Sequence, residues 1–394
     1  MFKKYFPIFE KQPDLVYFDS AATALKPKAL LDSISNYYQS ISANVHRGLY
    51  KNSELATELY DKSREYLKDF FLSNFDYSYT YNASYALNIL AHIFLKNLDK
   101  SKKIVITEIE HNSNLLPFIE FAKLYNIEVL VVPYSNNFEQ SILDSLDETV
   151  SLLSMTAMSN VLGNKIAIKK IIDKCRSLGV KTVIDASQLS MHLDLSDISD
   201  CDAFVFSAHK VYGPTGLGIL AVNQNFMPDV KPVFFGGGMV LDVSLDSSDY
   251  VRGPQALEPG TPNIAAAIAF SDTLRFLDKL GKEKLIQYED DLAQYLYTKM
   301  SELSFIEPIS DLSRPATIFS FNIKGVHAHD VSYALSLKNI CVRAGKHCTN
   351  LLHEKSLMLS SGVRVSLGIY NTKQEIDFLC SELLNVYKEF NRKL

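Results

Sequence analysis

Three segments decide the fold: VSLLSMT at Val150–Thr156, AIKKIIDKCRSL at Ala167–Leu178 and KTVID at Lys181–Asp185. The first and third are short, continuous apolar runs, which predicts strands that are buried on both faces. The middle segment repeats apolar residues at helical spacing, and Gly179 follows it where the C-terminal cap of a helix belongs. A strand, a helix and a second strand in this order indicate a parallel sheet covered by helices.

The same alternation continues on both sides of this stretch. Further elements are predicted at residues 103–107 (KIVIT, strand), 115–125 (helix), 127–132 (strand), 202–207 (strand) and 217–222 (strand). From about Ile264 the pattern changes to a long helix, short strands and a C-terminal helix, predicted at residues 265–303, 316–323, 340–343 and 373–393. We therefore predict an α/β fold, with a mostly parallel sheet in a large domain (residues 15–275) and a smaller α+β domain (residues 1–14 and 276–394).

The composition excludes several classes of protein. The 394 residues carry a net charge of −5, so no basic excess points to a nucleic acid or an anionic membrane as partner. The N-terminal residues MFKKYFPIFEKQPDL match neither a signal peptide nor a membrane span, and we expect a cytoplasmic protein. Five cysteines without a CxxC pair predict no disulfide framework and no metal site: Cys175, Cys201, Cys341, Cys348 and Cys380.

Residues with reactive or ligand-binding side chains follow three of the predicted strands. They form the clusters Glu110–Ser113, Asp185–Gln188 and Ser207–Lys210. The carboxyl ends of strands form the ligand crevice of an open α/β sheet, so these clusters are expected to meet there. Together they suit a phosphorylated heteroaromatic aldehyde, with a lysine for its carbonyl and an aspartate for its ring nitrogen. Taken singly, each has a plainer interpretation: a solvated loop lysine, a helix-capping aspartate or a structural histidine.

Motifs follow one another along nearly the whole chain: YFDSAAT (Tyr17–Thr23), NVHRG (Asn44–Gly48), EHNSN (Glu110–Asn114), MSNVLGN (Met158–Asn164), IDASQ (Ile184–Gln188), SAHKVYGPTGLG (Ser207–Gly218), FFGGGMV (Phe234–Val240), EPGTPN (Glu258–Asn263), RAGKHC (Arg343–Cys348) and VRVSLGIYNT (Val363–Thr372). With these motifs the sequence resembles the pyridoxal-phosphate enzymes of the class V aminotransferase family. Within that family it is most similar to the group II cysteine desulfurases and selenocysteine lyases. The resemblance implies fold type I, with a seven-stranded type of sheet in the large domain.

The resemblance also implies which residues would bind pyridoxal phosphate. Lys210 would hold its aldehyde, Asp185 would pair with its ring nitrogen, and Gln188 would bond its ring hydroxyl. His111 would stack on the ring and act as an acid or base. The remaining cofactor positions are Ser207, His209 and Ser84 at the phosphate, with Asn160 beside the ring. Ser84 lies in YNASYALN, where the family usually has a G-T-T-E type of turn, but its hydroxyl and a helix N-terminus still suit a phosphate.

Substrate and subunit contacts follow from the same resemblance. Arg364 would hold the substrate carboxylate, a task that suits a bidentate guanidinium, and Asn160 would lie beside the substrate. Arg343 would support the active-site loop near the substrate, and an ordinary structural ion pair is its plainer interpretation. Thr261 would reach the phosphate of the neighbouring subunit's cofactor, which implies a homodimer with shared active sites.

Cys348 distinguishes the desulfurases from other members of the family. A cysteine in this RxGxHC type of loop would attack the substrate sulfur, and Lys346 and His347 would favour its thiolate. Thr349, Asn350 and Leu351 depart from the usual residues after the cysteine. The other four cysteines are expected to be packing residues.

The resemblance therefore predicts an enzyme, a cysteine desulfurase. It would convert L-cysteine to L-alanine, form a persulfide on Cys348 and pass the sulfur to an acceptor protein for iron–sulfur cluster assembly. Three alternatives stay open: a selenocysteine lyase acting on L-selenocysteine, a class V aminotransferase or epimerase without sulfur chemistry, and a non-catalytic partner of such an enzyme.

Overall fold

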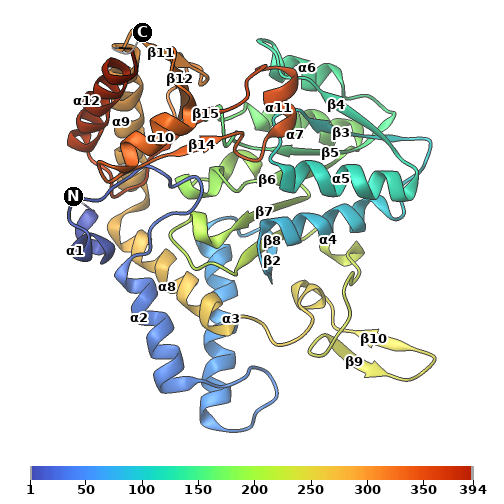
Figure 1. Cartoon of the computed structure of the whole chain (residues 1–394). Helices are drawn as coiled ribbons and strands as arrows, with labels where there is room; N and C mark the ends of the chain where they lie inside the picture. The colour runs from blue at the N-terminus through green and yellow to red at the C-terminus, as the bar shows by residue number, and fades with distance from the viewer. Residues whose placement is uncertain (1, 392–394) are drawn as a thin grey trace.

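The computed structural model describes residues 2–391. A seven-stranded sheet lies at its centre (Figure 1), in the order β2-β8-β7-β6-β5-β3-β4. The pairs β7-β6, β6-β5, β5-β3 and β3-β4 are parallel, whereas β8 runs antiparallel to both of its neighbours. The predicted α/β class with a mostly parallel sheet is therefore confirmed. The strands are β2 (Phe75–Thr80), β3 (Lys103–Thr107), β4 (Glu128–Val132), β5 (Val150–Thr156), β6 (Lys181–Asp185), β7 (Ala203–Ser207) and β8 (Gly218–Asn223).

Helices bury both faces of this sheet. On one face, α4 and α5 pack over Ile104 and Ile106; on the other, α3, α7 and α8 pack in the same core as Val105. Successive side chains of a strand point to opposite faces, so covering both faces requires the continuous apolar runs seen in the sequence. The helices here are α2 (Lys28–Asn36), α3 (Lys51–Phe70), α4 (Ala83–Leu95), α5 (Asn112–Tyr125), α6 (Phe138–Asp144), α7 (Ile168–Leu178) and α8 (Ile264–Leu280).

A second sheet has its own apolar core. Its strands pair antiparallel in the order β11-β12-β15-β14. Residues such as Phe319 and Val365 pack there against α9, α10 and α12. The elements are α9 (Lys282–Ser301), β11 (Ile306–Pro308), β12 (Ile318–Ile323), α10 (Ala328–Ser336), β14 (Arg343–Gly345), α11 (Asn350–Lys355), β15 (Gly362–Ser366) and α12 (Lys373–Asn391). The proposed domain bounds at residues 14/15 and 275/276 stay a prediction.

Short elements complete the chain. Near the N-terminus α1 (Ile8–Lys11) precedes β1 (Val16–Tyr17), which pairs in parallel with β13 (Ile340–Cys341). The hairpin of β9 (Val240–Val243) and β10 (Ser248–Tyr250) projects away from the main body (Figure 1). No helix between residues 2 and 391 is long and apolar enough to cross a membrane.

Several predicted bounds change. The single helix predicted at residues 265–303 is two helices, because Gly281 interrupts them with a φ of 93°. Helix α5 starts at Asn112, three residues earlier than predicted, because the His111 side chain accepts a hydrogen bond from the backbone N–H of Ser113 and caps the helix. The predicted end of the last helix at Lys393 lies outside the described residues.

Candidate active site

The carboxyl ends of β3, β5, β6 and β7 open into a cavity of about 320 Å³. The second sheet supplies the opposite side, through β14, β15 and the loop after β14. All but one of the predicted site residues line this cavity: Ser84, His111, Asn160, Asp185, Gln188, Ser207, His209, Lys210, Arg343, Cys348 and Arg364. Thr261 does not line it and is exposed on its loop.

Lys210 and Asp185 both line the cavity. Asp185 ends β6, and its Oδ1 accepts a hydrogen bond of 2.9 Å from the backbone N–H of Ser187. Lys210 closes a short 3₁₀ turn after β7. Burial lowers the pKa of Lys210 to about 8, although Asp185 opposes that shift. An amine with this pKa can exist in its neutral form near neutral pH and act as a nucleophile or base.

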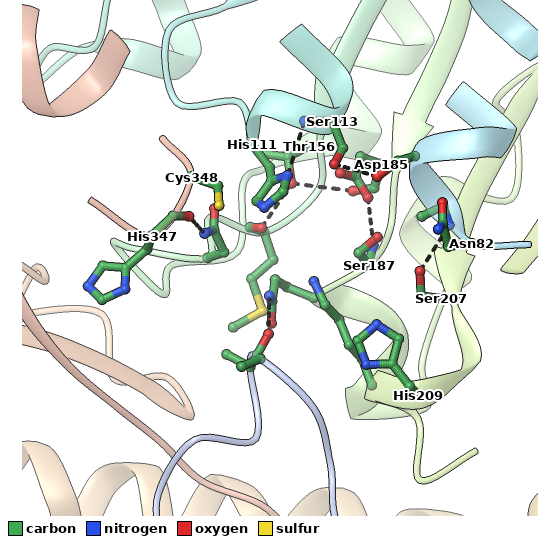
Figure 2. A pocket seen from close by; sticks show the side chains of 18 of the residues that line it. Asn82, His111, Ser113, Thr156, Asp185, Ser187, Ser207, His209, His347 and Cys348 are labelled. Carbon is green, nitrogen blue, oxygen red and sulfur yellow. Dashed lines mark hydrogen bonds between the residues drawn. The ribbon is translucent and has the colours of Figure 1, made fainter. Parts of the chain in front are cut away.

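His111 lies between Asp185 and Cys348 (Figure 2). Burial, with the Lys210 ammonium, lowers the pKa of His111 to about 4, so its ring is neutral at pH 7. Its Nδ1 accepts a 3.1 Å bond from the Ser113 backbone N–H, which places the ring proton on Nε2. His111 can therefore donate a proton or a hydrogen bond from Nε2.

The N-terminus of α4 forms one end of the cavity, near Ser207 and Asn82 (Figure 2). Ala83 donates its backbone N–H to Ser207 Oγ at 2.9 Å, and Ser84 Oγ lies 2.6 Å from Ser113 Oγ. Backbone N–H groups and the dipole at a helix N-terminus favour a phosphate. Burial lowers the pKa of His209 to about 4, so this neighbour is neutral as well.

Four residues that line this cavity each have a buried polar atom without a hydrogen-bond partner among residues 2–391, and two of these atoms test the fit of the cavity to pyridoxal phosphate. They are Gln188 Oε1 and His209 Nδ1, while Gln188 Nε2 donates to the Ala21 carbonyl at 3.1 Å. A buried polar atom without a partner costs free energy, so such atoms point to a polar ligand. Gln188 Oε1 suits the ring hydroxyl and His209 Nδ1 suits the phosphate, so the residues fit this cofactor.

Two arginines on neighbouring strands of the second sheet line the cavity. Arg343 on β14 and Arg364 on β15 stand directly opposite each other, an arrangement in which like charges repel. Asp19 lies between them: its carboxylate accepts a 2.9 Å bond from Arg343 Nη2 and a 3.3 Å bond from Arg364 Nη2. Arg364 Nη1 donates to the Asn160 carbonyl, and Arg364 Nε is buried with no hydrogen-bond partner between residues 2 and 391.

Asp19 is a residue of this site for which the sequence predicts no role. It lies in the YFDSAAT motif, just after β1, but its partners are more than 300 residues away in sequence. The available signal was the position itself, a carboxylate that directly follows a strand.

Cys348 is exposed on the loop after β14, on the side of the cavity away from Ser207 (Figure 2). The loop is held through its backbone. The Cys348 carbonyl accepts a 2.7 Å bond from the Asn112 N–H, and the His347 carbonyl accepts one of 2.7 Å from Asn160 Nδ2. His347 and Cys348 both have left-handed backbones, with φ of 51° and 59°. These contacts hold the thiol at the mouth of the cavity.

The prediction that His347 is a cation beside Cys348 is wrong, whereas the role of Lys346 in favouring the thiolate stays a prediction. The His347 ring is buried and lies 3.2 Å from the Gly362 carbonyl, and burial with the nearby Arg364 lowers its pKa to about 2. Lys346 pairs with Glu354 on α11 at 2.7 Å. The cations that line the cavity together with Cys348 are Arg343, Arg364 and Lys210.

Comparisons with known proteins agree with this geometry. A cysteine desulfurase from Thermococcus onnurineus superposes with a TM-score of 0.91 at 29% identity, over 98% of this chain and 97% of that one. The Escherichia coli cysteine desulfurase CsdA gives a TM-score of 0.90 at 27% identity, over 98% of each chain. Among curated proteins, one named "Probable cysteine desulfurase" from Halalkalibacterium halodurans is 35% identical over 97% of this chain and 96% of its own length.

The fold and the cavity define an enzyme of fold type I, the class that binds pyridoxal phosphate at the carboxyl ends of such a sheet. A sequence model described as "Aminotransferase class-V" matches residues 16–379. The chain belongs to the class V aminotransferase family.

Proposed function

We propose that this protein is a pyridoxal-phosphate-dependent cysteine desulfurase that converts L-cysteine to L-alanine. One observation carries the proposal: Lys210, Arg364 and the exposed thiol of Cys348 line the same cavity. An aminotransferase needs the first two residues but has no use for a thiol at the mouth. The Halalkalibacterium halodurans relative, similar over nearly its whole length, carries the same activity in its name.

Four residues that line the cavity have separate roles in the reaction at Cα. When bound, pyridoxal phosphate supplies an electron sink that makes the Cα proton of the amino acid acidic. Arg364 binds the substrate carboxylate through its guanidinium. Lys210 takes the Cα proton on Nζ, for which a pKa of about 8 is well suited. Asp185 would pair with the ring nitrogen of the cofactor, and Gln188 would bind its ring hydroxyl.

Cys348 then removes the sulfur. Its thiolate attacks the substrate Sγ, so that an S–S bond forms while the Cβ–S bond breaks. The electron pair of the broken bond goes to Cβ, which takes a proton and becomes the methyl group of alanine, and Lys210 Nζ returns a proton to Cα. Lys210 Nζ and His111 Nε2 are the available proton donors. The enzyme is left with a persulfide on Cys348, from which a thiol reductant releases sulfide.

The decisive experiment is mass spectrometry of the Cys348 peptide after incubation with L-cysteine. One added sulfur atom on this peptide is the expected result, with alanine formed in step. Alanine without added sulfur on any cysteine would contradict the proposal. Transfer of the amino group to an oxo acid without sulfur release would identify an aminotransferase. A parallel assay with L-selenocysteine measures whether selenium release exceeds sulfur release, as a selenocysteine lyase requires.

We also propose a cytoplasmic homodimer with shared active sites, which passes its sulfur to an acceptor protein for iron–sulfur cluster assembly. Thr261 is exposed outside its own cavity, as a residue that serves a second subunit must be. The exposed thiol of Cys348 is accessible to an acceptor, and five free cysteines suit a reducing compartment. Mixing Lys210→Ala with Thr261→Ala subunits tests the shared site, because activity should reappear in the mixed dimer.

A further inference from the structure

A buried hydrogen-bond network joins helix α9 to two segments of the active site. Glu289 on α9 is only 3% exposed. Its Oε1 accepts a 3.1 Å bond from the Tyr212 hydroxyl, and its Oε2 lies 3.0 Å from His192 Nδ1. None of these three residues has a role in the proposed chemistry.

Tyr212 connects Glu289 to the turn that carries Lys210. It follows Lys210 by two residues and has a left-handed φ of 59°, which is uncommon for an aromatic residue and has an energetic cost. Its hydroxyl is held on both sides, since it donates to Glu289 and accepts a 3.1 Å bond from the Ile369 N–H. Burial and the Glu289 carboxylate raise the pKa of Tyr212 far above its usual value, so the hydroxyl stays a donor.

His192 connects Glu289 to the segment of Gln188. It ends the 3₁₀ turn Leu189–His192, which begins directly after Gln188. Its Nε2 lies 3.0 Å from the Thr317 hydroxyl, and the Thr317 carbonyl accepts a 2.8 Å bond from the N–H of Leu367, just beyond β15. One arrangement satisfies every group: Thr317 donates to Nε2, and Nδ1–H donates to Glu289.

Glu289 is an unusual group to bury for stability alone. Within residues 2–391, no lysine or arginine lies within ion-pair distance of its carboxylate. A buried carboxylate without a strong cation costs free energy, and an apolar side chain of similar volume would often be as good for folding. Such a group is better explained by the arrangement that it fixes.

We infer that Glu289 is a positioning residue that fixes the turn of Lys210, through Tyr212, and the segment of Gln188, through His192. Glu289 is carried by α9, which packs against the second sheet. Its carboxylate therefore fixes the positions of the Lys210 turn and the Gln188 segment relative to that helix. This inference rests on the proposed roles of Lys210 and Gln188 in binding pyridoxal phosphate.

The test compares variants by the affinity of the apo-protein for pyridoxal phosphate, by kcat and KM, and by thermal unfolding. We expect Tyr212→Phe and Glu289→Leu each to weaken cofactor binding about tenfold. The double variant should bind the cofactor no more weakly than the single variant with the lower affinity, because both changes break the same connection. Glu289→Gln should restore affinity to within about threefold of the wild type, since its amide oxygen still accepts from Tyr212.

Tyr77→Phe is the matched control. Tyr77 is also fully buried, and its hydroxyl donates to the Leu72 carbonyl at 2.9 Å and accepts from the Leu72 N–H at 3.0 Å. This change should lower the unfolding midpoint and leave cofactor affinity unaltered. If Tyr212→Phe behaves like Tyr77→Phe, Glu289 has only a structural role and the inference is wrong; Tyr212→Phe alone decides this if Glu289→Leu does not fold.

Lys210→Ala separates the inference from the proposed function. If Lys210→Ala retains wild-type cofactor affinity and desulfurase turnover, the proposed function itself fails. If Lys210→Ala loses both while Tyr212→Phe matches the wild type, only the role of Glu289 is refuted.

Discussion

The two sides of the cavity are built differently. The sheet side carries Lys210, Asp185 and Gln188 on strand ends and the turns that directly follow them, among buried neighbours. The loop side carries Cys348 on an exposed turn with two consecutive left-handed residues. Two hydrogen bonds to backbone carbonyls hold this loop, one donated by the Asn112 N–H and one by Asn160 Nδ2.

The difference matches the two tasks of the proposed enzyme. Burial on the sheet side lowers the pKa values of Lys210 and His111, and it leaves polar atoms of Gln188 and His209 for a bound ligand. A sulfur atom must leave the enzyme, however, so the residue that carries it has to reach solvent. We therefore expect changes on the sheet side to disturb cofactor binding, and changes on the loop side to disturb sulfur transfer alone.

Lys210→Ala should have the largest effect. It removes both the amine that holds the cofactor and the base at Cα, so alanine formation should fall by about 10³-fold or more. The measurement is alanine release from L-cysteine at saturating cofactor. Lys346→Ala is the control on the loop side, where loss of the exposed pair with Glu354 should change activity less than about twofold. Equal losses in both variants would contradict the division between the two sides.

Cys348→Ala should abolish sulfur transfer and leave the sheet side intact. Without the thiol no persulfide can form, and sulfide release from L-cysteine should fall by about 10²-fold or more. Cofactor affinity and the absorbance of the bound cofactor should match those of the wild type. Cys341→Ala, which changes a partly buried thiol on β13, is the matched control and should retain activity. A Cys348→Ala protein with altered cofactor binding would show that the two sides are coupled.

The buried amine of Lys210 should also appear in the pH dependence of apo-protein stability. Its pKa is about 8 when folded, against 10.5 ordinarily, so between these values the unfolded chain binds more protons. The free energy of unfolding attributable to Lys210 therefore rises as pH increases through this window. Urea unfolding of the wild type and Lys210→Met, at about pH 8 and about pH 10, isolates the contribution, which we expect to be a few kcal/mol. A difference between the two proteins that does not change with pH would refute the lowered pKa.

Asp19→Asn should affect substrate binding more than chemistry. The change removes the charge that lies between the opposed arginines, so Arg364 loses its ionic partner and keeps only its bond to the Asn160 carbonyl as a fixed contact. We expect KM for L-cysteine to rise about tenfold and kcat to change less than about twofold. A lower KM would instead mean that the Asp19 carboxylate competes with the substrate carboxylate for Arg364.

Much of the sheet could be predicted from sequence, for a physical reason. Strands β3, β5 and β6 have the predicted bounds because burial on both faces demands short, uninterrupted apolar runs. The carboxyl ends of parallel strands meet at one edge, which is why His111, Asp185 and Lys210 line the same cavity, as expected.

The loop side was harder to predict, because its properties arise from tertiary contacts. His347 looks cationic in sequence, and its burial in the folded chain, with Arg364 nearby, makes it neutral. Nothing in the sequence around Asp19 indicates that its carboxylate pairs with two arginines. The predicted role of Cys348 came from the resemblance to a family rather than from any local pattern.

Thr349→Val should produce the smallest effect and is the most selective test of the loop. Thr349 departs from the usual residue of the family, and its hydroxyl donates a 2.7 Å bond to the Lys346 carbonyl, which closes the turn that contains Cys348. Valine keeps the shape and loses this bond, at a cost of about 0.5–1.5 kcal/mol. If the closed turn aims the thiol, persulfide formation should slow by about threefold to tenfold, with unchanged cofactor affinity. Thr349→Ser keeps the hydroxyl and should retain the wild-type rate; an equal loss in the serine variant would assign the effect to packing by the methyl group instead.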